Sequence, residues 1–179
     1  MNAAIARRRR PLLTLLALCV QLGMLAREHL DGGVLSHHLL ANPDLPAVSN
    51  WWGLLLVPLL TWWAVGRAER RAQLAASGGR SLKPAPLTGF LCALAYGGVL
   101  AALFVAGSPL VDYLFFGLLA LALVLRLWHA EYLLGFVLAM SFVAGPVLPA
   151  MFGAVIAVFS WLVHTAARAL WRRLRPGMA

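Results

Sequence analysis

The sequence contains few charged residues, and few of those are acidic. Only 12% of its 179 residues are Asp, Glu, Lys or Arg, and six are acidic. Because a soluble domain has about 25% charged residues, this scarcity excludes an ordinary soluble fold. Hydrophobic residues make up 62% of the chain, with a mean hydropathy of +0.83. They form uninterrupted blocks near the length of a membrane-spanning helix, so we predict an all-α integral membrane protein with a single membrane domain over residues 1–179.

Cysteine is also scarce, and catalytic motifs are missing. Cys19 and Cys92 each lie inside an apolar block without a C-x-x-C spacing, which argues against a thiol metal site or a redox pair. The sequence has no glycine-rich phosphate loop, G-x-S-x-G elbow or H-E-x-x-H motif. It also has no internal repeat, which counts against an inverted-repeat transporter. No reaction can therefore be assigned from a motif.

Positive charge is present in excess, but its placement argues against nucleic-acid binding. The net charge is +9 and the isoelectric point is near 11.3. Most basic residues flank apolar blocks, as the positive-inside rule describes, so we expect them to face the cytoplasm and anionic lipid headgroups of the bilayer. The three clusters are Arg7 to Arg10, then Arg67, Arg70, Arg71, Arg80 and Lys83, then Arg168, Arg172, Arg173 and Arg175.

The apolar blocks predict a bundle of about six transmembrane helices. An even number of spans places all three basic clusters on the cytoplasmic side, whereas five spans would place the last one outside. We interpret the first block as an uncleaved span, and the composition suits a multi-pass protein of the bacterial inner membrane with both termini cytoplasmic. The predicted spans are 11–26, 51–66, 87–106, 110–128, 132–144 and 147–165, with an outer loop at 27–50, a cytoplasmic loop at 67–86 and a basic cytoplasmic tail at 166–179.

Glycine and proline predict where the helices stop. Gly32 and Gly33 should end the first helix, because paired glycines disfavour helix and allow positive φ. We expect a short interfacial helix from Val34 to Leu40 in the outer loop. Ser49 and Asn50 offer an N-cap for the second span. Gly145 and Pro146 should divide 132–165 into two spans, with a re-entrant hairpin or one long kinked helix as the alternatives.

The outer loop, 27–50, is the predicted site of any chemistry. It holds three of the five histidines and three of the six acidic residues. Imidazole and carboxylate ligands suit a divalent transition metal such as zinc, which can activate a water molecule for hydrolysis. The alternatives are a hydrated loop whose polar groups bond to backbone and headgroups, and a proton- or ligand-responsive role for the histidines. The candidate catalytic residues are Glu28, Asp31 and Asp112, and the candidate metal ligands are His29, His37 and His38.

Two further polar groups lie at the ends of the fourth span. Asp112 begins that span, where it either pairs with Arg27 or interacts with the positive end of the helix dipole. Arg126, His129 and Glu131 follow its inner end. A histidine there could ligate haem or a metal together with a facing helix, but side chains reaching an ordinary inner interface are the favoured interpretation.

These features leave three functional hypotheses. The first is a metal-dependent hydrolase or transferase that acts on a lipid or lipid-linked substrate at the outer face. The second is a small carrier or permease, which requires a polar path through the midplane. The third is a non-catalytic membrane module that docks a protein partner or forms a homo-oligomer through faces of small residues.

Overall fold

The computed structural model describes residues 3–38, 42–79 and 85–174, and side chains from Arg9 onward. This described part of the chain folds into six α-helices and one short hairpin. The helices are α1 (Ala3–Leu30), α2 (Gly53–Ser77), α3 (Pro86–Val105), α4 (Leu110–Val124), α5 (Ala130–Ala144) and α6 (Val147–Leu174). Strands β1 (Ser36–His38) and β2 (Ala47–Ser49) form the antiparallel hairpin, and the 3-10 helix η2 (Asn50–Trp52) leads from it into α2.

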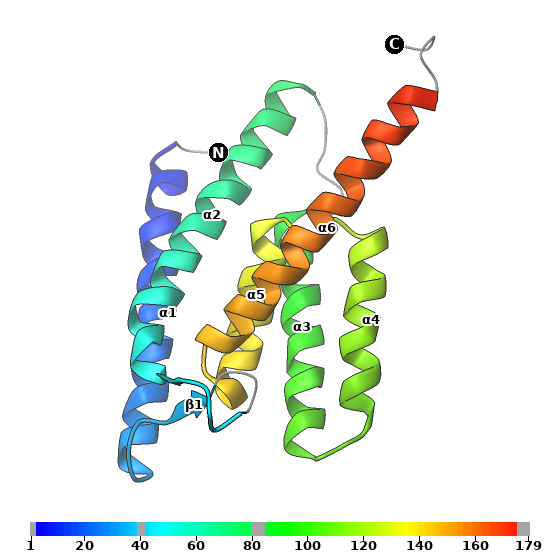
Figure 1. The fold of residues 1–179 in the computed structure, drawn as a ribbon. Helices are drawn as coiled ribbons and strands as arrows, with labels where there is room; N and C mark the ends of the chain where they lie inside the picture. The colour runs from blue at the N-terminus through cyan, green and yellow to red at the C-terminus, as the bar shows by residue number, and fades with distance from the viewer. Residues whose placement is uncertain (1–2, 39–41, 80–84, 175–179) are drawn as a thin grey trace.

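The helices alternate in direction, so the connections fall at two opposite ends of the bundle (Figure 1). The start of α1 and the end of α6 lie at one end, which we call the inner end. The hairpin and the α3–α4 and α5–α6 turns lie at the other, the outer end (Figure 1). The principal helix contacts join α1 to α2, α3 to α5, α5 to α6 and α2 to α5. The α1–α2 pair is therefore connected to the rest of the bundle mainly through α5.

Three of the described helical segments are long and apolar enough to cross a membrane: Arg9–Leu30, Pro86–Val105 and Val147–Leu174. Many large apolar side chains point outward, including Phe116, which is 71% exposed. In water this would be costly, whereas lipid solvates such surfaces. The helices α4 and α5 are also apolar but shorter. The helical, membrane-associated character predicted from the sequence is thus confirmed.

Helix α5 is the centre of the bundle and approaches α3 closely. A methyl group on Gly135 would overlap the Phe90 carbonyl oxygen, and one on Gly97 would lie 2.9 Å from the Ala139 Cβ. Glycine at these positions therefore lets the two backbones approach, as small residues do in membrane helix pairs. At about 1.5 Å per residue, α5 is only about 22 Å long, but most of its surface faces protein rather than lipid.

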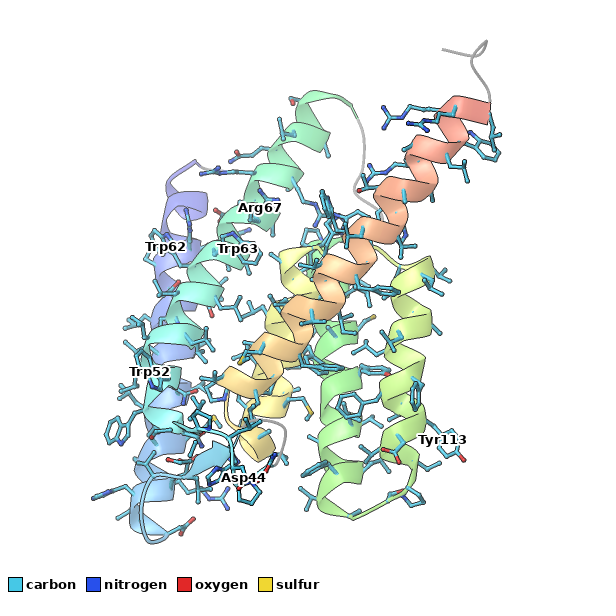
Figure 2. The ribbon with its side chains drawn as sticks, viewed as in Figure 1. Asp44, Trp52, Trp62, Trp63, Arg67 and Tyr113 are labelled. Atoms are coloured by element: carbon cyan, nitrogen blue, oxygen red, sulfur yellow. The ribbon has the colours of Figure 1, made fainter. Side chains whose placement is uncertain are left out.

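One arginine joins α1 to α2 near the inner end. The Arg10 guanidinium lies over the Trp62 ring, with its carbon 4.1 Å from the ring centroid, and its Nε donates to the Trp62 carbonyl at 2.8 Å. Gly66 provides the space beneath this guanidinium. Figure 2 shows Trp62 and Trp63 further along α2 than Trp52, which lies near the hairpin, and Arg67 follows them. Trp52 therefore lies near the outer end of α2, and Trp62 and Trp63 lie closer to the inner end.

The predicted interfacial helix at 34–40 is wrong for its described residues. Ser36, His37 and His38 instead form strand β1, paired with Ser49, Val48 and Ala47 of β2. Leu39 and Leu40 lie outside the described residues. The short segment carried no decisive helical period, and pairing with a distant strand satisfies its backbone hydrogen bonds instead.

Several helices do not end where the predicted spans end. Helix α2 continues to Ser77 through most of the predicted 67–86 loop, and α6 continues to Leu174 through the predicted tail. Residues 80–84 and 175–179 of those segments lie outside the described chain. Helix α4 ends at Val124 rather than at Trp128, and α1 extends beyond 11–26 in both directions.

The predicted helix stops at glycine are confirmed. Helix α1 ends at Leu30, and Gly32 and Gly33 have φ of 118° and 132°. Gly145 has φ of 64° and separates α5 from α6, which run in opposite directions (Figure 1). One long kinked helix over this region is therefore excluded. The Ser49 hydroxyl accepts from the Trp51 N–H, as expected for the N-cap.

Candidate functional site

Four residues of the outer end form a clasp: the polar Glu28 and Asn50, and the closely packed Gly53 and Gly145. Glu28 lies in the last turns of α1, where its Oε2 accepts from the Leu35 N–H at 3.1 Å. Its Oε1 accepts from the Asn50 amide Nδ2 at 2.7 Å. Asn50 is only 4% exposed, and its own N–H donates to the Leu35 carbonyl. Both Glu28 oxygens therefore hold the hairpin against α1.

Two glycines fit the clasp against the α5–α6 turn. A methyl group on Gly145 would overlap the Asn50 Oδ1, and one on Gly53 would lie 2.7 Å from the Pro146 Cγ and overlap the Gln21 amide. Gln21 is 2% exposed. The clasp therefore joins α1, α2 and the α5–α6 turn at the outer end.

The outer histidines occupy three different environments. His38 contacts the Leu45 carbonyl through Nδ1 at 2.8 Å, which closes the hairpin loop. His37 is half-buried beside Gly145, near the clasp. His29 is exposed at the end of α1. Although His37 and His38 are adjacent in sequence, their side chains point to opposite faces of β1 because side chains alternate along a strand.

The remaining candidate carboxylates do not join them. Asp31 is exposed and forms an ion pair with Arg27 at 3.4 Å, so the pairing of Arg27 with Asp112 considered from the sequence is replaced by a local one. Asp112 is exposed in the first turn of α4, where the helix dipole favours its charge. Among the described residues, no three His, Cys, Asp or Glu side chains are placed to hold a metal ion.

A second candidate site is a lateral groove between the α1–α2 pair and helices α3 and α5. Its volume is about 580 Å³. Its mouth includes strongly exposed side chains such as Leu16, Leu87 and Phe142, so it opens sideways from the bundle. The walls are mainly apolar. They include Leu13, Leu16, Ala17, Val20 and Met24 of α1, Val57 and Ala64 of α2, Phe90 and Leu94 of α3, and Leu134 and Leu138 of α5.

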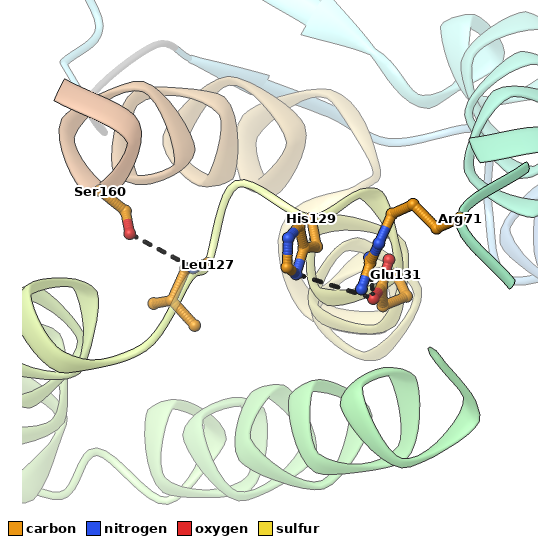
Figure 3. Close-up of polar contacts among 5 residues, drawn as sticks. All are labelled: Arg71, Leu127, His129, Glu131 and Ser160. Atoms are coloured by element: carbon orange, nitrogen blue, oxygen red, sulfur yellow. Dashed lines mark hydrogen bonds and ion pairs between the residues drawn. The ribbon is translucent and has the colours of Figure 1, made fainter. Parts of the chain in front are cut away.

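Charged side chains lie at the inner end of this groove. Arg9, Glu69 and Glu131 line it there, from α1, α2 and α5 respectively. Glu131 is the most buried of the three, with 5% exposure. The Arg71 Nη1 donates to the Glu131 Oε1 at 2.5 Å, so the charge of Glu131 is paired (Figure 3). The pair connects α2 to the start of α5.

His129 contributes little positive charge to this group. Its Nδ1 lies 4.0 Å from the Glu131 Oε1 (Figure 3). Burial, and then the nearby Arg71 guanidinium, lower the pKa of His129 below its ordinary value. The imidazole is therefore neutral at pH 7, and Arg71 balances the Glu131 carboxylate. The His129 ring also contacts Trp128, which packs in turn against His164 of α6.

The second oxygen of Glu131 differs from the first. Its Oε2 is buried, and no described protein group donates a hydrogen bond to it. A buried carboxylate oxygen without a donor is costly, since its lost hydration is not replaced. This oxygen belongs to a side chain that lines the groove.

A buried serine fixes the loop that precedes Glu131. The Ser160 hydroxyl of α6 shares its one O–H between two carbonyl oxygens. That of Ala122 lies 2.8 Å away and that of Leu125 lies 2.9 Å away. The hydroxyl also accepts from the Leu127 N–H at 3.2 Å (Figure 3). These bonds satisfy the unpaired backbone groups at the end of α4. Ser160 thereby positions the α4–α5 connection.

Sequence reasoning placed Glu131 at the inner end but missed its partner and the groove. It treated Arg71 as part of a solvated loop, so no carboxylate seemed within reach. The run from Arg67 to Ser77 consists mainly of strong helix formers, and this was the available signal that α2 continues. The buried positions of Gln21 and Asn50 depend on contacts between distant segments and have no local signal.

The chain was also compared with known proteins. No protein-family model, curated protein or solved structure matches it.

Proposed function

We propose that this protein is a multi-pass membrane protein that binds one lipid or lipid-linked amphiphile in the lateral groove. In this proposal all six helices cross a bacterial inner membrane, with both termini and the basic clusters on the cytoplasmic side. The alternating helix directions support this arrangement (Figure 1). Arg9 in the early part of α1 and Arg168 in the late part of α6 also support it, because those two helix ends lie at the inner end. The basic clusters would also contact anionic headgroups.

The groove is the observation that carries the proposal. Along α1 it extends from Arg9 to Met24, a rise of about 22 Å at about 1.5 Å per residue. The hydrocarbon core of a bilayer is about 30 Å thick, so this length exceeds one leaflet. A volume of about 580 Å³ lies within the range of about 300–1,000 Å³ typical of ligand pockets. Apolar walls and a charged inner end match an amphiphile whose headgroup lies at the cytoplasmic surface.

The carrier hypothesis receives less support from the same groove. A polar pathway needs side chains that can bind a solute near the midplane. The hydroxyls available along the groove are directed to their own helices: Thr61 donates to the Val57 carbonyl at 2.8 Å, and Ser141 to that of Val137 at 2.5 Å. The remaining walls are predominantly apolar.

The metal-dependent enzyme stays a prediction. Its candidate residues at the outer end are dispersed, and both Glu28 oxygens are used in the clasp. These hydrogen bonds favour a structural role for Glu28. The groove is therefore a better supported site than the outer loop.

The groove proposal can be tested with two adjacent leucines of α1. Leu16 lines the groove and is 59% exposed, whereas Leu15 is 57% exposed and does not line it. Leu16→Trp should fill the groove, while Leu15→Trp adds the same ring to the lipid-facing surface. The measurement is native mass spectrometry of protein purified from membranes and washed extensively in detergent.

The expected result is one retained lipid per chain in the wild type and in Leu15→Trp, with strongly reduced retention in Leu16→Trp. Equal retention in the two variants, or no retained lipid in the wild type, would contradict the proposal. Circular dichroism and gel filtration of both variants show whether each remains folded.

A further inference from the structure

The apolar walls of the groove cannot by themselves select a ligand. Acyl chains of the surrounding bilayer are as apolar as leucine, so an apolar groove gains little from one chain over another. Selection must come from the polar end. There the Glu131 Oε2 is a buried acceptor without a donor among the described protein groups.

The headgroup should therefore carry hydrogen-bond donors and a positive charge. The other Glu131 oxygen already accepts from Arg71, so a donor at Oε2 would complete the carboxylate. Glu69 also lines this end, which gives two carboxylates there. Because Arg71 balances the charge of Glu131, the Glu69 carboxylate is the group that an anionic headgroup would meet unfavourably.

The same end also provides a cation for a phosphate. Arg9 of α1 lines the groove together with the carboxylates of Glu69 and Glu131. Guanidinium groups bind phosphate strongly through charge-assisted hydrogen bonds. The lining charges of Arg9, Glu69 and Glu131 thus complement a zwitterion that carries a phosphate and an ammonium.

We infer that the groove binds a phospholipid whose headgroup carries a primary ammonium. The ammonium donates to the Glu131 Oε2, the phosphate faces Arg9, and an acyl chain extends along the groove toward Met24 and Phe142. This inference rests on the proposed lipid-binding function and adds the headgroup chemistry to it.

Three lipids separate the possible sources of selectivity. Phosphatidylethanolamine has both the positive charge and N–H donors. Phosphatidylcholine has the same charge but no N–H donor, and phosphatidylglycerol has hydroxyl donors but a net negative charge. A charge-assisted hydrogen bond to a buried carboxylate contributes enough to favour phosphatidylethanolamine about tenfold over phosphatidylcholine.

The experiment uses the full-length protein, delipidated in detergent and then incubated with an equimolar mixture of these three lipids with identical acyl chains. Native mass spectrometry gives the amount of each bound lipid. Glu131→Gln keeps the shape of the side chain and an acceptor for Arg71, but removes the charge. Asp44→Asn removes an exposed carboxylate from the hairpin loop at the outer end, opposite the charged inner end of the groove, and is the matched control (Figure 2).

We expect the wild type and Asp44→Asn to bind phosphatidylethanolamine about tenfold better than the other two lipids. Glu131→Gln should bind all three more nearly equally. Equal binding of phosphatidylethanolamine and phosphatidylcholine by the wild type, preference for phosphatidylglycerol, or unchanged selectivity in folded Glu131→Gln would overturn the headgroup assignment while leaving the lipid groove intact. Failure of the wild type to bind any of the lipids would instead overturn the proposed function.

Discussion

Removal of Arg71 tests whether the Glu131 carboxylate is held charged inside the protein. The side chain of Glu131 is 6% exposed and that of Arg71 is 25% exposed. In Arg71→Met the carboxylate stays buried but loses its partner. Breaking a buried ion pair from one side costs about 3–5 kcal/mol, and the partial exposure of Arg71 places this pair near the lower limit.

A second argument gives a similar magnitude. The unpaired carboxylate can escape the cost of burial by binding a proton. Neutralising an ordinary glutamate at pH 7 costs about 3.7 kcal/mol, which sets an upper limit. We therefore expect Arg71→Met to lower the free energy of unfolding by about 3 kcal/mol. The free energy of unfolding should fall much less in the double variant Arg71→Met/Glu131→Leu, because both charges are replaced by apolar groups.

The assay is unfolding in mixed micelles, with far-UV circular dichroism measured as the denaturing detergent is increased. The wild type, the single variants Arg71→Met and Glu131→Leu, and the double variant form a thermodynamic cycle. A coupling free energy of about 2 kcal/mol or more supports the buried pair. Additive effects, or a cost below about 0.5 kcal/mol for Arg71→Met, would show that water reaches Glu131 and would refute the reasoning.

Two further predictions concern the packing that supports the groove. Gly135→Ala should lower the unfolding free energy by several kcal/mol, because its methyl group meets the Phe90 carbonyl oxygen, whereas Gly98→Ala has open space and should stabilise α3 by up to about 1 kcal/mol. The same unfolding assay checks both, and equal effects would contradict the close α3–α5 packing. Ser160→Ala should cost about 1–3 kcal/mol because the Leu127 N–H and the carbonyls at the end of α4 lose their partner. The exposed Ser77→Ala is its control, and a cost as small as that of the control would count against the role of Ser160.

Local sequence signals predicted the helix ends that depend on backbone preferences. Gly32 and Gly33 end α1, Gly145 divides α5 from α6, and Ser49 caps the start of the next helix. Each of these features depends on positive φ or on a hydrogen bond to a near neighbour, so the responsible residues are adjacent in sequence.

The features that the sequence did not predict depend on distant segments. The β1 segment from Ser36 to His38 becomes a strand only because Ala47 to Ser49 pairs with it. Glu131 contacts Arg71 only because α2 continues as a helix beyond the apolar block and places Arg71 beside the start of α5. The concentration of histidine and carboxylate in the outer loop suggested a single site, but strand alternation and the Glu28–Asn50 hydrogen bond disperse those groups.

The groove lies between α1 and the α3–α5 pair because α1 has few contacts with those two helices. Helix α2 contacts α5 directly, whereas α1 is held mainly by α2 and, at the outer end, by the clasp. This leaves space between α1 and the α3–α5 pair. In the proposed function, lipid occupies this space, so leaving it open between the helices costs little. The charged inner end distinguishes this groove from an ordinary gap between helices.

The most direct test of the lipid groove is photochemical cross-linking from α1. A benzophenone amino acid replaces Leu16, which lines the groove, or Leu15, which has similar exposure and faces away from it. The protein is washed in detergent before illumination, and intact mass spectrometry then identifies adducts. The account predicts a phospholipid adduct at position 16 and little or none at position 15. Equal adducts at both positions, or an adduct at position 15 alone, would contradict it.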